Sequence, residues 1–181
     1  SGFMRGFRRS VQAVFQDPSA SLNPRMRVRQ IITEPILAHE RPGRAALDKR
    51  VAEVLEIVGL PVTAADLYPH EFSGGQRQRI AIARALALEP ELIVCDEAVS
   101  ALDVSIQAQV IALLDKLRRE LGIAFIFIAH DLPVVRDFAD HVMVMKSGKL
   151  VESGTVRQIF ENPREDYTRR LLDAGLDPDP H

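Results

Sequence analysis

The residues from His70 to Asp103, HEFSGGQRQRIAIARALALEPELIVCDEAVSALD, decide how this chain folds. A Ser-x-x-Gln capping box begins a helix at Ser73, which we expect to run to about Leu88. The apolar run from Glu91 to Cys95 then predicts a buried strand that ends at an acidic pair. The stretch therefore predicts a helix followed by a strand, with polar residues where the strand ends.

The same alternation continues on both sides of this stretch. Downstream we expect a helix from Val104 to about Leu121, a strand from Ile123 to Ile128 and a helix from Leu132 to Ala139. Upstream, VQAVF from Val11 to Phe15 is typical of a short strand. Strands separated by helices indicate an α/β fold with a mainly parallel sheet and covering helices.

The remaining segments predict a helical part and a hairpin. Apolar residues at helical spacing between Val28 and Leu60 indicate an α-helical subdomain, entered by a loop from Gln16 to Pro24. Ser147-Gly148 separates two alternating stretches, which predicts a hairpin. The expected C-terminal elements are strands His141–Lys146 and Lys149–Ser153, helices Thr155–Phe160 and Asp166–Leu172, and a frayed tail from Asp173 onward.

The acidic pair Asp96-Glu97 is a candidate site for phosphate chemistry. The two carboxylates follow a buried strand, and open α/β sheets bind their ligands at the carboxyl ends of the strands. One acid can hold Mg²⁺ while the next orients a water that attacks a γ-phosphate. An isolated Asp-Glu pair would more simply begin a solvated loop, so the interpretation depends on the surrounding motifs.

The motif Ser73-Gly74-Gly75-Gln76 has two compatible interpretations. Ser-x-x-Gln caps a helix and needs no ligand. The two glycines also leave the backbone N–H groups at the helix N-terminus bare, which makes an anion site. Taken alone, the motif is explained more simply by capping.

Two further polar residues follow predicted strands. His130 ends the strand that we expect to lie parallel to the one bearing Asp96, so it should emerge at the same sheet edge and could contact a γ-phosphate. Gln16 follows Val11–Phe15, and its amide could position water or complete a metal shell. Both residues are also explained by structural or solvated roles.

Composition limits the class of protein. The chain has 181 residues, 46% of them hydrophobic, which suffices for a globular core. A net charge of -2 and a pI near 6.2 give no general attraction to nucleic acid or anionic membranes.

The single cysteine, Cys95, excludes an internal disulfide and an all-cysteine metal or iron–sulfur site in one copy. The apolar run Ile123 to Ala129 is far shorter than the roughly 20 residues of a membrane span, so we expect a soluble chain in a reducing compartment.

The motifs together resemble the ATP-binding subunits of ABC transporters. Gln16 matches the Q-loop, Ser73 to Gln76 the signature motif, LIVCDE the Walker B strand, Ser100 to Asp103 the D-loop and His130 the switch histidine. The resemblance implies a P-loop NTPase fold of the ABC type with ATP and Mg²⁺ as cofactors. It implies Glu97 and His130 as catalytic residues, Asp96 and Gln16 as metal residues, and Gln16, Ser73, Gly74, Gly75, Gln76 and Asp103 as nucleotide-binding residues.

The resemblance also implies partners and a location. The family works as a pair of such subunits, with each ATP held between Walker A of one and the signature motif of the other. Such a subunit would contact transmembrane permease subunits at the cytoplasmic face of the inner membrane, and indirectly a solute-binding protein. No nucleic acid partner is implied. The expected parts are 1–18 (core end with the Q-loop), 19–80 (helical subdomain), 81–160 (C-terminal core) and 161–181 (C-terminal helix and tail).

The Walker A loop is missing from the sequence. Gly148-Lys149 is followed by Leu150 rather than Ser or Thr and fails the phosphate-loop pattern. Because the chain also opens with Ser1-Gly2, we expect a partial ATPase core, cut before Gln16, that binds ATP weakly by itself. Removal of the Walker A strand should also leave the edge of Ile123 to Ile128 exposed.

Within the family, three segments resemble importers of oligopeptides or dipeptides: VFQDPSASLNPRMRV, CDEAVSALDVSIQAQV and ENPREDYTRRLL. Importers of nickel or other small solutes share much of these segments and remain an alternative. A non-catalytic module that uses only the signature surface is a second alternative. A family member acting on nucleic acid is a third, which the six arginines before Gln30 might suggest, although these are more simply a solvated face.

Overall fold

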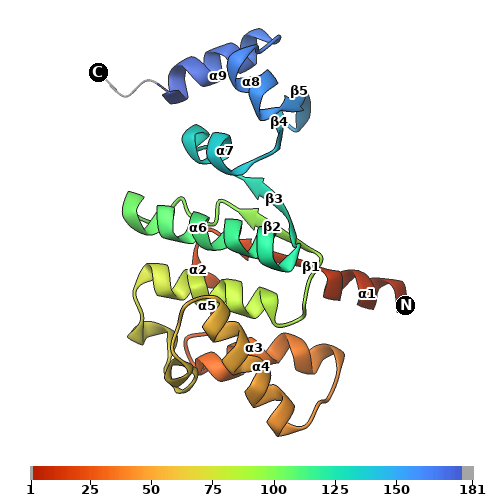
Figure 1. The fold of residues 1–181 in the computed structure, drawn as a ribbon, viewed down its shortest axis with the longest axis vertical. Coiled ribbons are helices and arrows are strands. Elements are labelled where there is room, and N and C mark those ends of the chain that lie inside the picture. Colours follow the sequence, from red (N-terminus) through yellow and green to blue (C-terminus); the bar gives the residue numbers. More distant parts are fainter. Residues whose placement is uncertain (1, 177–181) are drawn as a thin grey trace. The chain divides into compact units, whose positions relative to one another are not determined.

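The computed structural model describes residues 2–176, which form two compact units, one ending at Ile128 and the other beginning at Ala129 (Figure 1). The first unit contains a sheet with its helices and the helical part. The second contains a hairpin and short helices. Each unit is described by itself below.

The sheet of the first unit consists of three parallel strands in the order β1-β2-β3. These are β1 Val11–Phe15, β2 Leu92–Asp96 and β3 Ala124–Ile128. Ile93 and Cys95 of the central strand are fully buried, which agrees with the continuous apolar run that predicted it. The parallel sheet expected from the sequence is confirmed.

The first unit also contains two long helices, α5 and α6. Helix α5 spans Gly74–Leu86 and contacts both β1 and α6, while α6 spans Val104–Leu121 as predicted. The Asp103 carboxylate accepts a hydrogen bond from the Ile106 amide at 3.0 Å, and Gly122 ends α6 with a φ of 65°. One side of α6 is buried, through Val110, Leu113, Leu114 and Leu117.

The helical part differs in detail from the prediction. The pattern from Val28 to Leu60 forms two helices, α3 Val28–His39 and α4 Arg44–Ile57, because Pro42-Gly43 interrupts it. Short 3₁₀ helices follow at Val62–Asp66 and Pro69–Glu71. The expected loop from Gln16 to Pro24 contains a helix, α2 Pro18–Ser21, which Asp17 caps.

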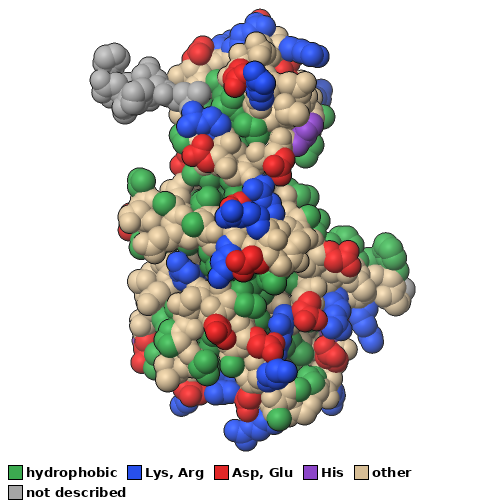
Figure 2. Space-filling model, viewed as in Figure 1, with side chains coloured by type: hydrophobic (Ala, Val, Ile, Leu, Met, Phe, Trp, Pro, Cys, Tyr) green, Lys and Arg blue, Asp and Glu red, His purple; other side chains and the backbone are tan. Residues whose placement is uncertain are grey.

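Helix α1, Gly2–Ser10, was not predicted from the sequence. None of its residues is buried, and Phe3 is 80% exposed. Lysine, arginine and acidic side chains are interspersed on the face of the first unit seen in Figure 2. The viewed face therefore carries no extended patch of one sign.

The second unit begins with α7, Leu132–Phe138, and continues into an antiparallel hairpin. Strands β4 His141–Lys146 and β5 Lys149–Thr155 meet at Ser147 and Gly148, which both have positive φ as the predicted turn requires. Thr155 caps α8, Val156–Glu161, through the predicted capping box. Helix α9, Asp166–Leu176, is longer than expected. Residues 173–176 are helical rather than frayed, and the rest of the expected tail, 177–181, lies outside the described residues.

Two contacts hold the hairpin against α9 and the residues before it. Lys146 Nζ lies 4.6 Å from the centre of the Tyr167 ring. The Glu152 carboxylate accepts hydrogen bonds from the backbone amides of Arg164 at 2.8 Å and Glu165 at 3.1 Å. The Thr168 side chain, followed by the Arg164 amide, lowers the pKa of Glu152.

Two findings bear on expectations from composition. Over residues 2–176, no helix combines the length and the apolar character that a membrane crossing needs. Cys95 is buried, and desolvation raises the pKa of its thiol to about 12. The thiol is therefore protonated in the folded protein at neutral pH, which makes it a poor nucleophile.

The lowered pKa of Glu152 predicts an acid-sensitive contact. Because the folded pKa lies below the ordinary value of 4.5, the contact stabilises the second unit fully above that pH. The stabilisation is lost as the pH falls through the folded pKa. We expect Glu152→Gln to reduce protection of the Arg164 and Glu165 amides from hydrogen exchange at pH 7, measured by NMR and corrected for intrinsic rates.

The matched control is Glu161→Gln, because Glu161 pairs with Arg157 on the exposed side of α8. It should leave protection of the two amides unchanged. Equal protection in Glu152→Gln and the unmodified chain at pH 7 would show that the carboxylate does not hold this contact.

Candidate functional site

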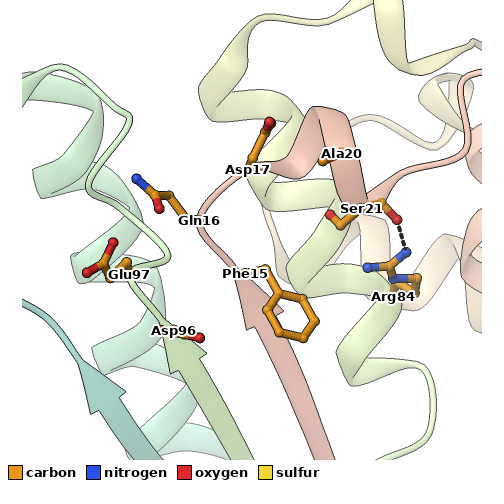
Figure 3. Close-up of a pocket in the computed structure, with 8 residues that line it drawn as sticks. All are labelled: Phe15, Gln16, Asp17, Ala20, Ser21, Arg84, Asp96 and Glu97. Carbon is orange, nitrogen blue, oxygen red and sulfur yellow. Dashed lines mark hydrogen bonds between the residues drawn. The ribbon is translucent and has the colours of Figure 1, made fainter.

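The parallel register brings three predicted site residues to one edge of the sheet. Phe15 pairs with Asp96, and Asp96 pairs with Ile128, so the strands end at the same level. Gln16, Asp96 and Glu97 all line one open pocket of about 660 Å³. Its other lining residues are Phe15, Asp17, Ala20, Ser21 and Arg84. In Figure 3 the Gln16 side chain extends toward the loop that carries Glu97, whereas Phe15 points away from it.

Glu97 has an unusual backbone conformation. Its φ is 50°, in the left-handed region that non-glycine residues occupy at a cost of about 1–3 kcal/mol. Hydrogen bonds on both sides hold this turn. The Glu97 amide donates to the Ile128 carbonyl at 2.9 Å, and the Ser100 amide and hydroxyl donate to the Glu97 carbonyl at 3.1 and 2.9 Å. The loop therefore turns sharply away from β2 directly after Asp96.

The pocket carries more negative than positive side chains. Asp17, Asp96 and Glu97 are acidic, while Arg84 is the one basic residue that lines it. The Arg84 guanidinium donates to the Ser21 carbonyl at 2.7 Å, and burial lowers its pKa, partly offset by Glu34. Arg84 was not predicted as a pocket residue, because only the packing of α5 against α2 brings it there.

The donor atoms in the pocket suit a magnesium ion. Mg²⁺ prefers oxygen ligands and normally takes one or two from protein while keeping waters or phosphate oxygens. Gln16 and Asp96 supply an amide oxygen and a carboxylate, and among residues 2–176 no histidine or cysteine lines the pocket. Within residues 2–176, no three His, Cys, Asp or Glu side chains gather as a metal cage. The arrangement fits an ion that takes its remaining ligands from solvent or substrate.

The signature residues start α5 as predicted. Ser73 Oγ accepts from the Gln76 amide at 3.3 Å, and Gln76 Oε1 accepts from the Ser73 amide at 3.0 Å. This reciprocal pair is the predicted capping box. Gly75 is buried, and a Cβ placed on it would lie 2.4 Å from Cγ2 of Ile106, whereas one on Gly74 would lie 3.8 Å from Leu102. Gly75 therefore permits α5 to approach α6 closely.

The structure also shows where the other two predicted site residues, Asp103 and His130, lie within their own units. Asp103 is exposed and caps α6. His130 is exposed and belongs to the second unit, just before α7. Their roles toward a nucleotide remain predictions.

A parallel sheet with an oxygen-rich site at its carboxyl edge, joined to a helical part by a glycine-led helix, defines an ATPase core of the ABC type. The family model described as ABC transporter matches residues 3–100. The chain belongs to this family.

Two relatives show which members of the family this chain is similar to. The chain is 54% identical over 177 residues to the oligopeptide transport ATP-binding protein OppF of Escherichia coli (strain K12), covering 97% of this chain and 53% of that protein. It is 53% identical over 177 residues to the glutathione import ATP-binding protein GsiA of Pectobacterium atrosepticum, covering 98% of this chain and 28% of that protein. The chain thus spans about half the length of OppF, or less of the longer relative.

A solved structure agrees with the fold. CbiO1 from Clostridium perfringens, described as part of the ABC transporter complex cbiONQ, matches with a TM-score of 0.77 and 32% identity. The match covers 87% of this chain and 61% of that one. The α/β fold of the ABC ATPase type predicted from the sequence is therefore confirmed.

The close approach at Gly75 yields a stability prediction. Gly75→Ala should destabilise the first unit by about 1–3 kcal/mol because the new methyl group overlaps Ile106. Gly74→Ala is the matched control and should have a much smaller effect, because its methyl group meets Leu102 at an ordinary contact distance. Urea unfolding followed by circular dichroism gives both values.

A double-mutant cycle with Ile106→Ala tests the cause. Shortening Ile106 should recover part of the stability lost in Gly75→Ala, giving a coupling energy of at least about 0.5 kcal/mol. Additive losses in the double variant, or equal losses for the two glycines, would contradict the packing explanation.

Proposed function

We propose that this chain carries the catalytic base, Q-loop and signature motif of an ATP-binding and ATP-hydrolysing subunit that energises peptide import across the bacterial inner membrane. The observation that supports this most directly is the convergence of Gln16, Asp96 and Glu97 in one pocket at the carboxyl ends of neighbouring parallel strands. Ligands of open α/β sheets bind at such an edge. Family membership gives these residues a common purpose.

The residues have distinct roles in the proposed reaction. Asp96 and Gln16 would hold Mg²⁺, which when bound neutralises charge on the phosphates. Glu97 would orient the attacking water and accept its proton, since its carboxylate stands on the turn directly after Asp96. His130 would contact the γ-phosphate.

The phosphates need positive groups that the pocket lacks. Three carboxylates line it against one guanidinium, and that guanidinium is already bonded to the Ser21 carbonyl. The sequence contains no Gly-x-x-x-x-Gly-Lys-Ser/Thr pattern. We therefore infer that the phosphate loop belongs to a segment other than residues 1–181, and we expect the chain itself to bind ATP weakly.

The signature motif would serve a second nucleotide-binding subunit. Ser73 to Gln76 and Asp103 would face the nucleotide of that partner, bringing two subunits together around ATP. The helical subdomain, 19–80, would contact the permease subunits, and the cores at 1–18 and 81–160 would carry the ATP chemistry, with 161–181 as a C-terminal extension. The chain would then work at the cytoplasmic face of the membrane, with a solute-binding protein as indirect partner.

The peptide substrate class rests on relatives. The curated names include oligopeptide transport proteins, a glutathione import protein and the putative peptide import ATP-binding protein BAB2_1053 of Brucella abortus (strain 2308), which is 54% identical over 167 residues. Glutathione is itself a tripeptide, so these names share one substrate chemistry.

Manganese binding tests the metal site without any need for turnover. Mn²⁺ replaces Mg²⁺ at oxygen sites and broadens the NMR signals of nearby amides. We expect broadening at Gln16, Asp96 and Glu97, and its loss in Asp96→Asn. Asp66→Asn removes an exposed acid that pairs with Arg29 at 3.2 Å and should leave the broadening unchanged. Identical broadening in the unmodified chain and Asp96→Asn would remove Asp96 from the metal site.

ATP hydrolysis by the complete importer tests the catalytic assignment. In proteoliposomes containing the permease, a partner subunit and a solute-binding protein, Glu97→Gln should lower the hydrolysis rate by at least about 10²-fold, as expected for loss of a general base. Glu91→Gln, an exposed acid just before β2, is the control. Stimulation of hydrolysis by peptides supports the substrate class. Stimulation only by nickel or another small solute would contradict the peptide class and assign that solute as the substrate.

A further inference from the structure

Gln78 is a polar residue on the buried side of the signature helix. It lies one turn after the start of α5 and is fully buried. Residues at its helical spacing form a buried stripe consisting of Gly75, Gln78, Ile82 and Ala85. An amide at this position costs free energy unless it is hydrogen-bonded, so its partners explain why it is there.

The Gln78 amide reaches two backbone segments that are distant in sequence. Its Nε2 atom donates to the Phe15 carbonyl at 3.2 Å and also to the Ala98 carbonyl. Phe15 immediately precedes Gln16, and Ala98 immediately follows Glu97. One side chain of α5 therefore joins the backbone beside both of these pocket residues.

A second side chain of α5 completes the attachment of the Q-loop segment. Arg84 Nη1 donates to the Ser21 carbonyl at 2.7 Å, so α5 holds the segment that contains Gln16 at Phe15 and again at Ser21. Within residues 2–176, Arg84 makes no hydrogen bond to the loop after Glu97, whereas Gln78 contacts both segments. Gln78 is thus the point at which the three segments meet.

Packing alone does not explain this amide. Its Oε1 atom is buried and, over residues 2–176, has no hydrogen-bond partner. Methionine or leucine would fill similar space without that unpaired acceptor. The amide differs from such residues in its donor, which holds the two carbonyls.

We propose that Gln78 is a positioning residue that fixes the signature-bearing end of α5 to the Phe15 and Ala98 carbonyls, which lie next to Gln16 and Glu97 in the chain. A shift of either pocket residue then moves the Phe15 or Ala98 carbonyl and, through Gln78, the turn that carries Ser73 to Gln76. The structural part stands on the contacts of this chain, while its catalytic consequence rests on the function proposed above. Gln78 itself touches neither nucleotide nor metal in this proposal.

Hydrogen exchange in this chain tests the attachment directly. Gln78→Met keeps the side-chain length and removes both donors, and Gln109→Met makes the same exchange at an exposed position of α6. We expect exchange of the Glu97, Ser100 and Arg77 amides to accelerate by about tenfold or more in Gln78→Met, as expected for loss of hydrogen bonds of ordinary strength. Amides of Val54 and Leu55 in α4 should be unaffected, and Gln109→Met should change none of them.

A conservative variant and a ligand test separate positioning from general destabilisation. Gln78→Asn keeps an amide that is too short to reach both carbonyls, and it should give intermediate exchange rates even if Gln78→Met fails to fold. Adding Mg²⁺ should change exchange at Gln76 and Arg77 in the unmodified chain, and Gln78→Asn should reduce that response. Uniform acceleration across the unit in both variants would overturn the proposal.

The complete importer gives the catalytic readout. Gln78→Asn should lower kcat for ATP hydrolysis severalfold with little change in KM, because the groups that contact nucleotide are retained. Unchanged kcat would overturn the catalytic consequence. If the unmodified importer hydrolyses no ATP, the proposed function fails while the exchange experiment still decides whether Gln78 positions the three segments.

Discussion

The pairing of β2 with its two neighbours is the constraint on which the site depends. Because all three strands run parallel and in level register, Phe15, Asp96 and Ile128 end together. This common end brings Gln16 and Glu97, which follow β1 and β2, to one edge of the sheet. A slip of one residue in either pair would reverse the facing of every side chain on the strand and separate Gln16 from the acids. Burial of Ile93 and Cys95 opposes such a slip, because it would move apolar side chains out of the core.

The strained backbone conformation at Glu97 depends on the fixed edge of the sheet. Glu97, a non-glycine residue with φ of 50°, is held by hydrogen bonds to Ile128 at the end of β3 and to Ser100 in the loop that follows Glu97. The same turn brings Ala98 to Gln78, so the loop is attached to the sheet on one side and to α5 on the other. The conformation thus places a carboxylate at the pocket and, one residue later, a carbonyl in the interior.

The sequence predicts those parts of the fold that local signals specify. Asp103 and Gly122 set both ends of α6, and the continuous apolar run predicts β2 to within one residue. The division at Pro42-Gly43 was also visible in the sequence but was missed, because apolar residues on both sides shared one spacing. Helix α1 was not predicted, although Phe3, Met4 and Phe7 stand at helical spacing, and none of its residues is buried.

The site shows the same limit. Gln16, Asp96 and Glu97 could be placed together because strand ends of a parallel sheet meet. Arg84 and Gln78 could not be assigned, since each has a partner 63 positions away in sequence and both depend on how α5 packs. Gln78 did leave a signal, a polar residue on an otherwise apolar helical stripe, which marks a buried hydrogen bond without naming its acceptor.

Capping and ligand binding at the signature motif are compatible for a physical reason. The Ser73 hydroxyl satisfies the amide of Gln76, whereas the amides of Gly74 and Gly75 come earlier in the first turn, where a helix offers them no carbonyl. The absence of a side chain on Gly75 lets this turn pack against Ile106, and the Ile106 amide is bonded to Asp103. The start of α5 therefore packs against the start of α6 through Gly75 and Ile106.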